Sequence, residues 1–483
     1  MNAQNWTFKL NRKPVKHRVF ARSAALVTAC AAIASSFATG STRAEPASPT
    51  TSQETVERAP LVPLPQELDK SFYRPPAKKV AAAQPGEILS ARRITAANFG
   101  AVPINVDAWQ LSFRSTDTFG RPIPAVTTIL KPRGTTSGPR KAISMQLAED
   151  STAGYCATSY AVQHLSAGAL AGQIVAPAEL LIAQGFISQG YAVVLPDHEG
   201  PNQAYAAGPL AGRITLDSLR AAKSFAPSQI TDSSKIGMYG YSGGAIATGH
   251  AAELKKSYAP ELNIVGVAEG GVPADLGAVL KAAQNNVTSG LILGAIIGLT
   301  REYDDFNKFL KRHVNPAGRA IMDMKRPLCV QYHAMTFPFL NNTGFINWPG
   351  DPLKAPPVKR VIDDTKMGTT RPDIPMFIWQ SALDEVVPVA QADTMVRRYC
   401  GVDGPSITYT RDHLSEHGIA EVSGAPMALL WLKDRLDGKP VKPGCTTRNK
   451  LTMATDSKWW PAFSNVIGSD LSALFGAAIG KGR

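Results

Sequence analysis

A serine lies within a glycine-rich stretch in the middle of the chain, Gly240–Gly244, which reads Gly-Tyr-Ser-Gly-Gly. Residues 235–239 before it have the short apolar pattern of a buried strand, and the next twelve residues are rich in alanine and favour a helix. A G-x-S-x-G turn between a strand and a helix raises the serine hydroxyl above the sheet edge, where a base can reach it. Ser242 is therefore the predicted nucleophile. Gly240 and Gly244 are expected to be required in the sharp turn because a side chain at either position would collide with the neighbouring strand or helix. A surface glycine turn is the alternative, which the flanking elements disfavour.

Serine is a weak nucleophile near neutral pH unless a histidine takes its proton and an acid orients that histidine. In α/β-hydrolases the chain order is serine, acid, histidine. Residues 375–379 read as a buried strand, and Asp384 lies on the loop that follows. We prefer Asp384 as the acid and keep the adjacent Glu385 as the alternative.

Two histidines follow the next predicted strand, at residues 406–410. His417 is flanked by Glu416 and a glycine and lies nearer to an apolar helix predicted from about residue 423 to 436, whereas His413 extends the strand. The pattern favours His417 as the base and leaves His413 as the alternative. The remaining histidines beyond the first 44 residues precede the acid, so chain order argues against them: His164, His198, His250, His313 and His333.

Acyl transfer also needs two backbone donors directed at the developing negative charge. The amide of Gly243, directly after the nucleophile, is one predicted donor. The second is expected in residues 148–152, after a predicted strand at 142–147, but no H-G-G-G run marks it. The sequence Asp197-His198-Glu199 follows another predicted strand at the same sheet edge, and we interpret it as structural because three neighbouring side chains cannot all face one ion.

The order of elements predicts the scaffold. Predicted strands near 125–131, 141–147, 191–195, 235–239, 263–268, 375–380 and 406–411 alternate with helical stretches such as 178–189 and 211–225. This alternation predicts an α/β class with the α/β-hydrolase arrangement, a mostly parallel sheet with helices on both faces. About a hundred residues between the strands at 263 and 375 show no strand pattern, and we expect them to form a helical cap insertion.

Several segments together resemble the secretory lipase family of α/β-hydrolases. They are Phe72–Pro76, Pro85–Arg92, Glu149–Thr152 with Cys156 and Ser159–Tyr160 after it, Pro196–Gly200, Gly240–Gly244, Ser257–Gly266, Asp384–Pro388 and Glu416–His417. The resemblance covers roughly Asp69 to Leu471. It implies Ser242 as nucleophile, Asp384 as acid and His417 as base, with Asp150 and Gly243 forming the oxyanion hole. The cap region matches the family poorly in detail.

Four of the five cysteines lie beyond the leader, an even number that fits disulfides in an oxidising compartment. They are Cys156, Cys329, Cys400 and Cys445. Three pairings are open from the sequence, and the family resemblance implies Cys156 with Cys329 and Cys400 with Cys445. Their spacing excludes a C-x-x-C zinc site, and we expect no metal and no cofactor.

The first 44 residues carry seven basic residues and no acid, and residues 23–41 are uncharged and mostly apolar. This pattern predicts an export signal cleaved near Thr42-Arg43-Ala44, with an uncleaved membrane anchor as the alternative. The protein is thus expected to be secreted or to lie in the periplasm or cell envelope. Without the leader the chain holds 44 basic and 38 acidic residues, a mild and scattered excess that does not favour nucleic-acid binding.

The expected organisation follows from these segments. Residues 1–44 are the signal peptide and 45–65 a disordered linker; 66–274 and 374–450 form the two parts of the hydrolase core; 275–373 form the helical cap or lid. The resemblance makes 451–483 a flap or tail over the site.

The sequence thus predicts a secreted serine lipase or carboxylesterase that hydrolyses acylglycerols or related lipid esters through an acyl-enzyme, with transient contact to a lipid interface. An esterase or acyltransferase acting on short soluble esters is the first alternative. A non-catalytic exported binding protein on the same fold is the alternative of another class, and a peptidase is a weaker option. The oligomeric state is not predicted.

Overall fold

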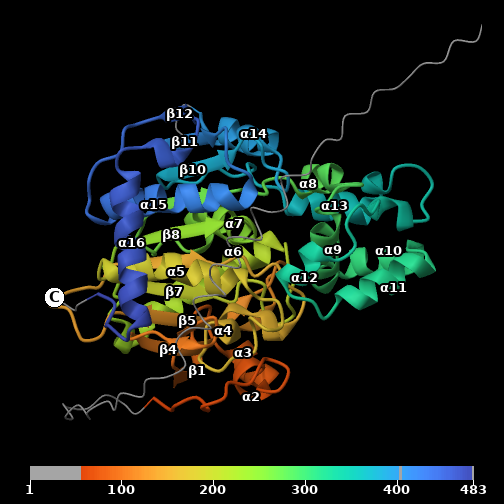
Figure 1. Ribbon diagram of the computed structural model, residues 1–483. Helices are drawn as coiled ribbons and strands as arrows, with labels where there is room; N and C mark the ends of the chain where they lie inside the picture. The colour runs from red at the N-terminus through yellow and green to blue at the C-terminus, as the bar shows by residue number, and fades with distance from the viewer. Residues whose placement is uncertain (1–55, 402–404, 481–483) are drawn as a thin grey trace, which may run out of the picture. The chain divides into compact units, whose positions relative to one another are not determined.

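The computed structural model describes residues 56–401 and 405–480, whose core is a ten-stranded sheet (Figure 1). Its strands, in spatial order, are β1 (Ile88–Arg93), β4 (Asp107–Thr116), β5 (Pro122–Lys131), β7 (Ala192–Pro196), β6 (Ala142–Gln146), β8 (Ile236–Tyr241), β9 (Ile264–Gly270), β10 (Met376–Ser381), β11 (Ile407–Asp412) and β12 (Cys445–Lys450). The seven strands from β7 to β12 pair in parallel. The other three extend the sheet in antiparallel pairing. The predicted α/β class with a mostly parallel sheet is confirmed.

Helices cover both faces of the sheet. The helices α6 (Gly208–Ser224), α7 (Gly243–Tyr258) and α14 (Val389–Tyr399) pack on one face, and α5 (Val175–Ser188), α15 (His417–Leu436) and α16 (Trp459–Leu474) on the other. Strand β10 shows why: Met376 and Ile378 enter the first core, while Phe377 and Trp379 enter the second. A strand buried on both sides by this two-residue alternation reads as a continuous apolar run, the pattern that predicted it.

All seven predicted strands are present, and three further strands of the ten-stranded sheet were missed: β1, β4 and β12. β12 reads Cys-Thr-Thr-Arg-Asn-Lys and lies mostly exposed at the sheet edge, so it carries no apolar pattern. β4 is buried along most of its length but includes polar residues such as Gln110 and Ser112 in the interior. Hydropathy alone does not identify such strands.

The segment between β9 and β10 is helical, as expected for a cap. It contains α8 (Leu276–Ala283), α9 (Ser289–Glu302), α10 (Asp304–His313), α11 (Pro316–Lys325), α12 (Val330–Met335) and α13 (Pro356–Asp364), with short 3-10 turns η3 (Asn342–Phe345) and η4 (Pro352–Lys354). The apolar run at Gly290–Leu299 forms most of α9. Its Gly298 packs directly on the backbone of Tyr205, where any side chain would collide. The run is therefore a packed helix of this segment.

The remaining described elements are short. They are α2 (Lys70–Tyr73), α3 (Ala77–Ala82), the strand pair β2 (Ala97–Asn98) and β3 (Val102–Pro103), η1 (Gly154–Cys156), α4 (Thr158–Ala161), η2 (Ala226–Ser228) and η5 (Met453–Thr455). Among the described residues, no helix combines the length and apolar character needed to cross a bilayer.

The two ends of the chain differ from expectation. The predicted leader, residues 1–44, and most of the predicted linker lie outside the described residues. The end of that linker is already bonded to the sheet, because Ala59 N–H donates to Arg93 O at 2.9 Å and Arg93 N–H donates to Glu57 O at 2.8 Å. The expected linker boundary at residue 65 was therefore too late.

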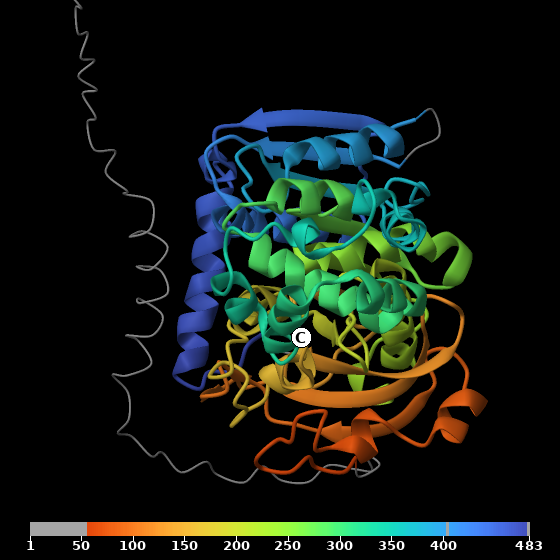
Figure 2. The ribbon, with the colours of Figure 1, turned by 90° about the vertical axis from the view of Figure 1, so that its right-hand side faces the viewer.

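The C-terminal segment was expected as a flap over the site, but α16 packs on α5 and α15 instead. Figures 1 and 2 show α16 apart from the α8–α13 segment, which lies on the other side in Figure 1. The reason is a stripe at helical spacing, Trp459, Ala462, Val466, Asp470 and Ala473, that faces the core. The indole N–H of Trp459 fixes the helix start by donating to Ser423 O at 2.8 Å.

Both implied disulfides are present. Cys156–Cys329 joins η1 to the start of α12, with Cα atoms 5.5 Å apart. Cys400–Cys445 joins the end of α14 to β12, with Cα atoms 5.9 Å apart. The first ties the segment that follows Asp150 to the helical insertion, and the second ties the edge strand to the core.

Candidate active site

Ser242 occupies the turn between β8 and α7 in a strained backbone conformation, with φ 51° and ψ −118°. Its N–H donates to Gly270 O at the end of β9, and its own carbonyl accepts the first bond of α7 from Ala245 N–H, both at 2.9 Å. A positive φ is costly for a residue with a side chain and persists only where the surroundings hold it. The turn thus presents the hydroxyl at the carboxyl edge of the sheet, at the N-terminus of a helix.

The glycines around Ser242 are required by contacts. A Cβ at Gly240 would lie 2.2 Å from Thr248 Oγ1, and one at Gly244 would lie 2.0 Å from the carbonyl oxygen of Gln146. Both distances are far below any real Cβ contact. The turn therefore brings α7 against β6 at a spacing that only glycine permits, as the sequence pattern predicted.

His417 is the first residue of α15, which begins earlier than the predicted residue 423. Glu416 caps this helix, because its carboxylate accepts the N–H groups of Gly418 at 2.9 Å and Ile419 at 2.6 Å. The prediction placed this start too late because Gly418, directly after His417, lowers the helical signal of the first turn. The cap fixes the direction in which the imidazole leaves the helix.

Asp384 lies on the loop after β10 with its side chain fully buried. Its Oδ1 accepts the N–H groups of Val386 at 3.0 Å and Val387 at 2.7 Å, and its Oδ2 accepts from Gln380 Nε2 at 2.8 Å. Three donors, one from β10 and two from the loop after it, hold the carboxylate in place.

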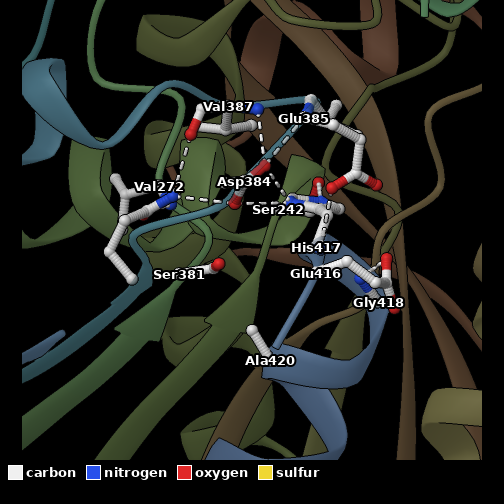
Figure 3. Close-up of polar contacts among 12 residues, drawn as sticks. Ser242, Val272, Ser381, Asp384, Glu385, Val387, Glu416, His417, Gly418 and Ala420 are labelled. Carbon is white, nitrogen blue, oxygen red and sulfur yellow. Dashed lines mark hydrogen bonds and ion pairs between the residues drawn. The ribbon is translucent and has the colours of Figure 1, made fainter. Parts of the chain in front are cut away.

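The three side chains meet in one hydrogen-bonded row (Figure 3). His417 Nε2 lies 2.8 Å from Ser242 Oγ, and His417 Nδ1 lies 2.9 and 2.8 Å from the two oxygens of Asp384. With the Nδ1 proton donated to Asp384, Nε2 is free to accept the serine proton. The structure thus brings together residues separated by 175 and 33 positions in the chain.

The alternatives from the sequence lie elsewhere. Glu385 accepts the backbone N–H of His417 at 3.1 Å and leaves the ring to Asp384. His413 is exposed and bonds Asn449 Oδ1 at 2.9 Å. His198, His250, His313 and His333 each contact a structural partner outside the row: Leu147 O, Thr365 O, Asn347 O and Thr152 Oγ1.

Asp150 lies against the first turn of α7. A Cβ at Gly243 would lie 1.6 Å from Asp150 Oδ1, so the carboxyl occupies the space beside the residue that follows Ser242. Asp150 is 4% exposed and has a positive φ of 43°. Burial raises its pKa to about 6, against the opposing influence of His198 and His417, while Tyr205 bonds the carboxyl. The strained backbone of Asp150 and the helix N-terminus at Gly243 thus meet beside the serine.

Buried carboxyl groups accept hydrogen bonds from the backbone in and after this loop. Glu149 accepts Thr158 N–H at 2.5 Å, and Asp197 accepts Ser159 N–H at 2.7 Å. Glu199 accepts Ser151 N–H at 3.3 Å. The Asp197-His198-Glu199 sequence therefore contacts the backbone around Asp150, in keeping with its structural interpretation, and none of its three side chains enters the row.

Burial and the charges around His417 shift the pKa of its imidazole in opposite directions. Burial lowers the pKa of His417, but the hydrogen bond and charge of Asp384, together with the charges of Glu385 and Glu421, raise it above its ordinary value. The imidazole is therefore well suited to hold a proton transiently between a serine and a leaving group.

Two supporting residues were missed by sequence reasoning. Tyr241 donates its hydroxyl to His417 O at 2.5 Å, and its ring lies 5.2 Å from the imidazole. Gln380 holds Asp384 as described. The capping role of Glu416 could have been predicted, because an acid directly before a helix can accept the free N–H groups of its first turn. The role of Tyr241 depends on packing and leaves no local signal.

No group of three metal-binding side chains occurs among residues 56–401 and 405–480.

A parallel sheet of this order, with a serine on the turn after β8, defines an α/β-hydrolase. The model of the secretory lipase family matches residues 165–444. Lipase A of Arthroderma benhamiae is 36% identical over 427 residues, covering 86% of this chain and 90% of that protein. A protein of Mycobacterium tuberculosis named probable inactive lipase is 33% identical over 384 residues, covering 79% and 84%. The X-ray structure of Candida antarctica lipase A matches with a TM-score of 0.76 at 30% identity, covering 86% of this chain and 98% of that one.

The chain belongs to the secretory lipase family, which confirms the resemblance seen in the sequence. Its function is that of a lipase or esterase, an ester hydrolase, and the family indicates an extracellular protein.

Proposed function

We propose that this protein hydrolyses lipid esters through an acyl-enzyme formed on Ser242, with His417 as general base and acid and Asp384 as the residue that orients it. The supporting observation is the row of hydrogen bonds, 2.8 Å from Ser242 Oγ to His417 Nε2 and 2.8 Å from His417 Nδ1 to Asp384. This observation matters because one relative is named a probable inactive lipase, so family membership alone does not decide activity.

In the first step Ser242 Oγ forms a bond to the ester carbonyl carbon while its proton moves to His417 Nε2. The amide N–H groups of Gly243 and Asp150 donate hydrogen bonds to the carbonyl oxygen, on which negative charge develops. The bond to the alcohol oxygen then breaks, and His417 returns the proton to the leaving alcohol. Water repeats the sequence in the second half: its proton goes to His417, its oxygen bonds the acyl carbon, and Ser242 regains a proton as the acid leaves.

The secretory lipase family and its lipase-named relatives support a lipid ester as the substrate. Helices α8, α9, α10 and α13 enclose a cavity of about 60 Å³ whose lining is apolar apart from one threonine. It is lined by Leu276, Val279, Leu280, Ile292, Ala295, Ile296, Leu299, Phe306, Val358, Val361, Ile362 and Thr365. Residues 275–373 are proposed as the cap, and residues 1–44 as an export signal that is removed from the mature protein.

The test is active-site labelling. Purified protein treated with a fluorophosphonate probe is expected to gain one adduct on Ser242, located by peptide mass spectrometry, and to lose esterase activity in proportion. Ser242→Ala is expected to remain folded, as checked by circular dichroism, and to lose both labelling and hydrolysis. Equal labelling or activity in Ser242→Ala and wild type would overturn the proposal.

A second measurement separates the substrate classes. Rates on emulsified long-chain triacylglycerol and on dissolved short-chain esters distinguish a lipase from a soluble-ester esterase, and adding an acceptor alcohol reveals acyl transfer. A higher rate on the emulsion supports the lipase assignment, whereas activity confined to dissolved esters contradicts it.

A further inference from the structure

Two buried carboxyl groups that take no part in the row face each other behind it. Glu179 lies on α5 and is 2% exposed. Glu421 lies on α15, one helical turn after His417. The carboxyl of each contacts that of the other. The contact therefore joins the helix that carries His417 to its neighbour on the same sheet face.

Glu179 also reaches the loop that carries Asp150. Its Oε2 accepts the backbone N–H of Ala148 at 2.7 Å. Ala148 lies two residues before Asp150 and two residues after the end of β6 at Gln146. A continuous path therefore runs from the proposed oxyanion loop through Glu179 and Glu421 to the first turns of α15.

The pair needs a proton. Among the described residues, Glu179 Oε1 and Glu421 Oε1 are buried and have no hydrogen-bond donor. Two ionised carboxylates in contact would repel in a buried site, whereas one shared proton turns the contact into a hydrogen bond. The orphaned oxygens are therefore explained if the pair carries a proton between them.

The groups around the pair do little to stabilise two ionised carboxylates. Asp150 acts on Glu179 from the oxyanion loop, and His417 acts on Glu421 from within α15. From β8, the Tyr239 phenol interacts with both carboxyls and the Tyr241 phenol with that of Glu421. Burial, followed by the charge of Glu421, raises the pKa of Glu179 well above its ordinary value, and burial raises that of Glu421. Both shifts favour a pair that holds a proton.

We propose that Glu179 and Glu421 are positioning residues, a proton-sharing carboxyl pair that ties the oxyanion loop to the helix carrying His417. The inference rests on the proposed function of the row. With its proton, the pair holds the loop and the helix at the separation that the row requires. When the proton is lost at alkaline pH, the two carboxylates repel, the tie opens and turnover falls.

The experiment compares Glu421→Gln, Glu179→Gln and Glu421→Ala by their pH–rate profiles on a dissolved short-chain p-nitrophenyl ester. A glutamine amide donates to the remaining carboxylate at every pH, so both Gln variants should retain neutral activity within about threefold and lose the alkaline decline of kcat. Glu421→Ala breaks the tie at every pH and should lower kcat roughly 10- to 100-fold with little change in KM, because small displacements of reacting groups are costly.

Glu253→Gln is the matched control. Glu253 is a buried carboxyl on α7 whose pKa burial raises to about 7, and it bonds Tyr399 and Gly368 away from the row. Its replacement should alter thermal stability at alkaline pH and leave the alkaline decline of kcat as in wild type.

An unchanged alkaline decline in both Gln variants, or an unchanged kcat in Glu421→Ala, would overturn the inference. The Gln variants conserve volume, so they decide the question even if Glu421→Ala does not fold. Fluorophosphonate labelling of Ser242→Ala separates the two proposals. If Ser242→Ala is unlabelled but still active, the proposed catalytic row is contradicted. If Ser242→Ala is inert while the Glu variants keep wild-type pH profiles, only the proposed role of the carboxyl pair is contradicted.

Discussion

Two residues at the site have a strained backbone: Ser242 and Asp150 both have a positive φ. Such conformations persist only where the surrounding structure enforces them. Ser242 is held by the bond to Gly270 and by α7. The segment after Asp150 is held because Glu199 accepts the N–H of Ser151 and Glu149 accepts that of Thr158. The site is therefore pre-organised by its immediate neighbours before any substrate binds.

Asp384→Asn should lower kcat by roughly 10⁴-fold, because an amide cannot hold the imidazole in the required tautomer. The acid limb of kcat/KM should also move to lower pH, since the bond and charge of Asp384 help raise the pKa of His417. A pH series of kcat/KM checks both. Glu385→Gln keeps an oxygen acceptor for the His417 N–H and removes one charge near the ring, so it should keep most of the activity. The reverse ranking of the two variants would reassign the acid.

Gly243→Ala should abolish activity, because its Cβ would be placed 1.6 Å from Asp150 Oδ1 and would displace the loop. Gly468→Ala on α16 is the control, since no atom lies within 4 Å of its added Cβ. This second change should leave activity intact and raise stability by about 0.5–1 kcal/mol, the usual gain of alanine over glycine within a helix. Specific activity and chemical unfolding of the two variants provide the comparison; an active Gly243→Ala would exclude close packing of Asp150 on the turn.

At the scale of elements, α16 carries an acid in the middle of its buried stripe. Asp470 is 6% exposed, and neither of its carboxylate oxygens has a hydrogen-bond donor among the described residues. Burial raises its pKa to about 8. The helix thus packs with Asp470 protonated, and its docking on α5 and α15 weakens once that proton is lost.

Asp470→Asn tests this reading of α16. The variant should match wild type in thermal stability near pH 5, where Asp470 is neutral in the folded state, and exceed it at pH 9, where wild type contains a buried charge. At a pH above the folded pKa, each unit by which folding raises the pKa of a carboxyl lowers the free energy of unfolding by about 1.4 kcal/mol. Melting temperatures at the two pH values give the result, and an equal difference at both would rule out ionisation as the cause.

The whole molecule buries several more carboxyls of this kind. Burial raises the pKa of Glu253 to about 7 and that of Glu269 to about 8. A folded carboxyl with a raised pKa keeps a proton that the unfolded chain has released, so the free energy of unfolding falls as pH rises from about 4.5 through the folded pKa. Buried histidines act in the opposite direction, because burial lowers the pKa of His250 to about 4 and that of His333 to about 3.

These histidines destabilise the folded state only as pH falls below about 6.5, where the unfolded chain takes up their protons. The raised carboxyls outnumber them, so stability should be greatest in mildly acidic solution, near pH 5, and decline steadily toward pH 9. Calorimetric melting across pH 3–9 measures the profile. A maximum at pH 8 or above would show that the buried carboxyls are ionised in the folded protein.

Local sequence determined much of this protein. The strands, the turn at Ser242 and the order of serine, acid and histidine are encoded in short runs, because alternation and glycine requirements act within a few residues of the chain. The fold class and the two disulfides followed from patterns and family resemblance and are confirmed. The catalytic roles of Ser242, Asp384 and His417 stay predictions, with a geometry that fits them.

Only the tertiary structure decided which side chains meet. Asp384 and Glu385 are neighbours in sequence, and the loop after β10 directs one to the imidazole and the other to a backbone amide. The start of α15 at His417, the place of α16 and the contact between Glu179 and Glu421 depend on segments far apart in the chain. Their positions are set by how helices pack on the sheet, and packing distances of that kind leave no periodic signal in the sequence.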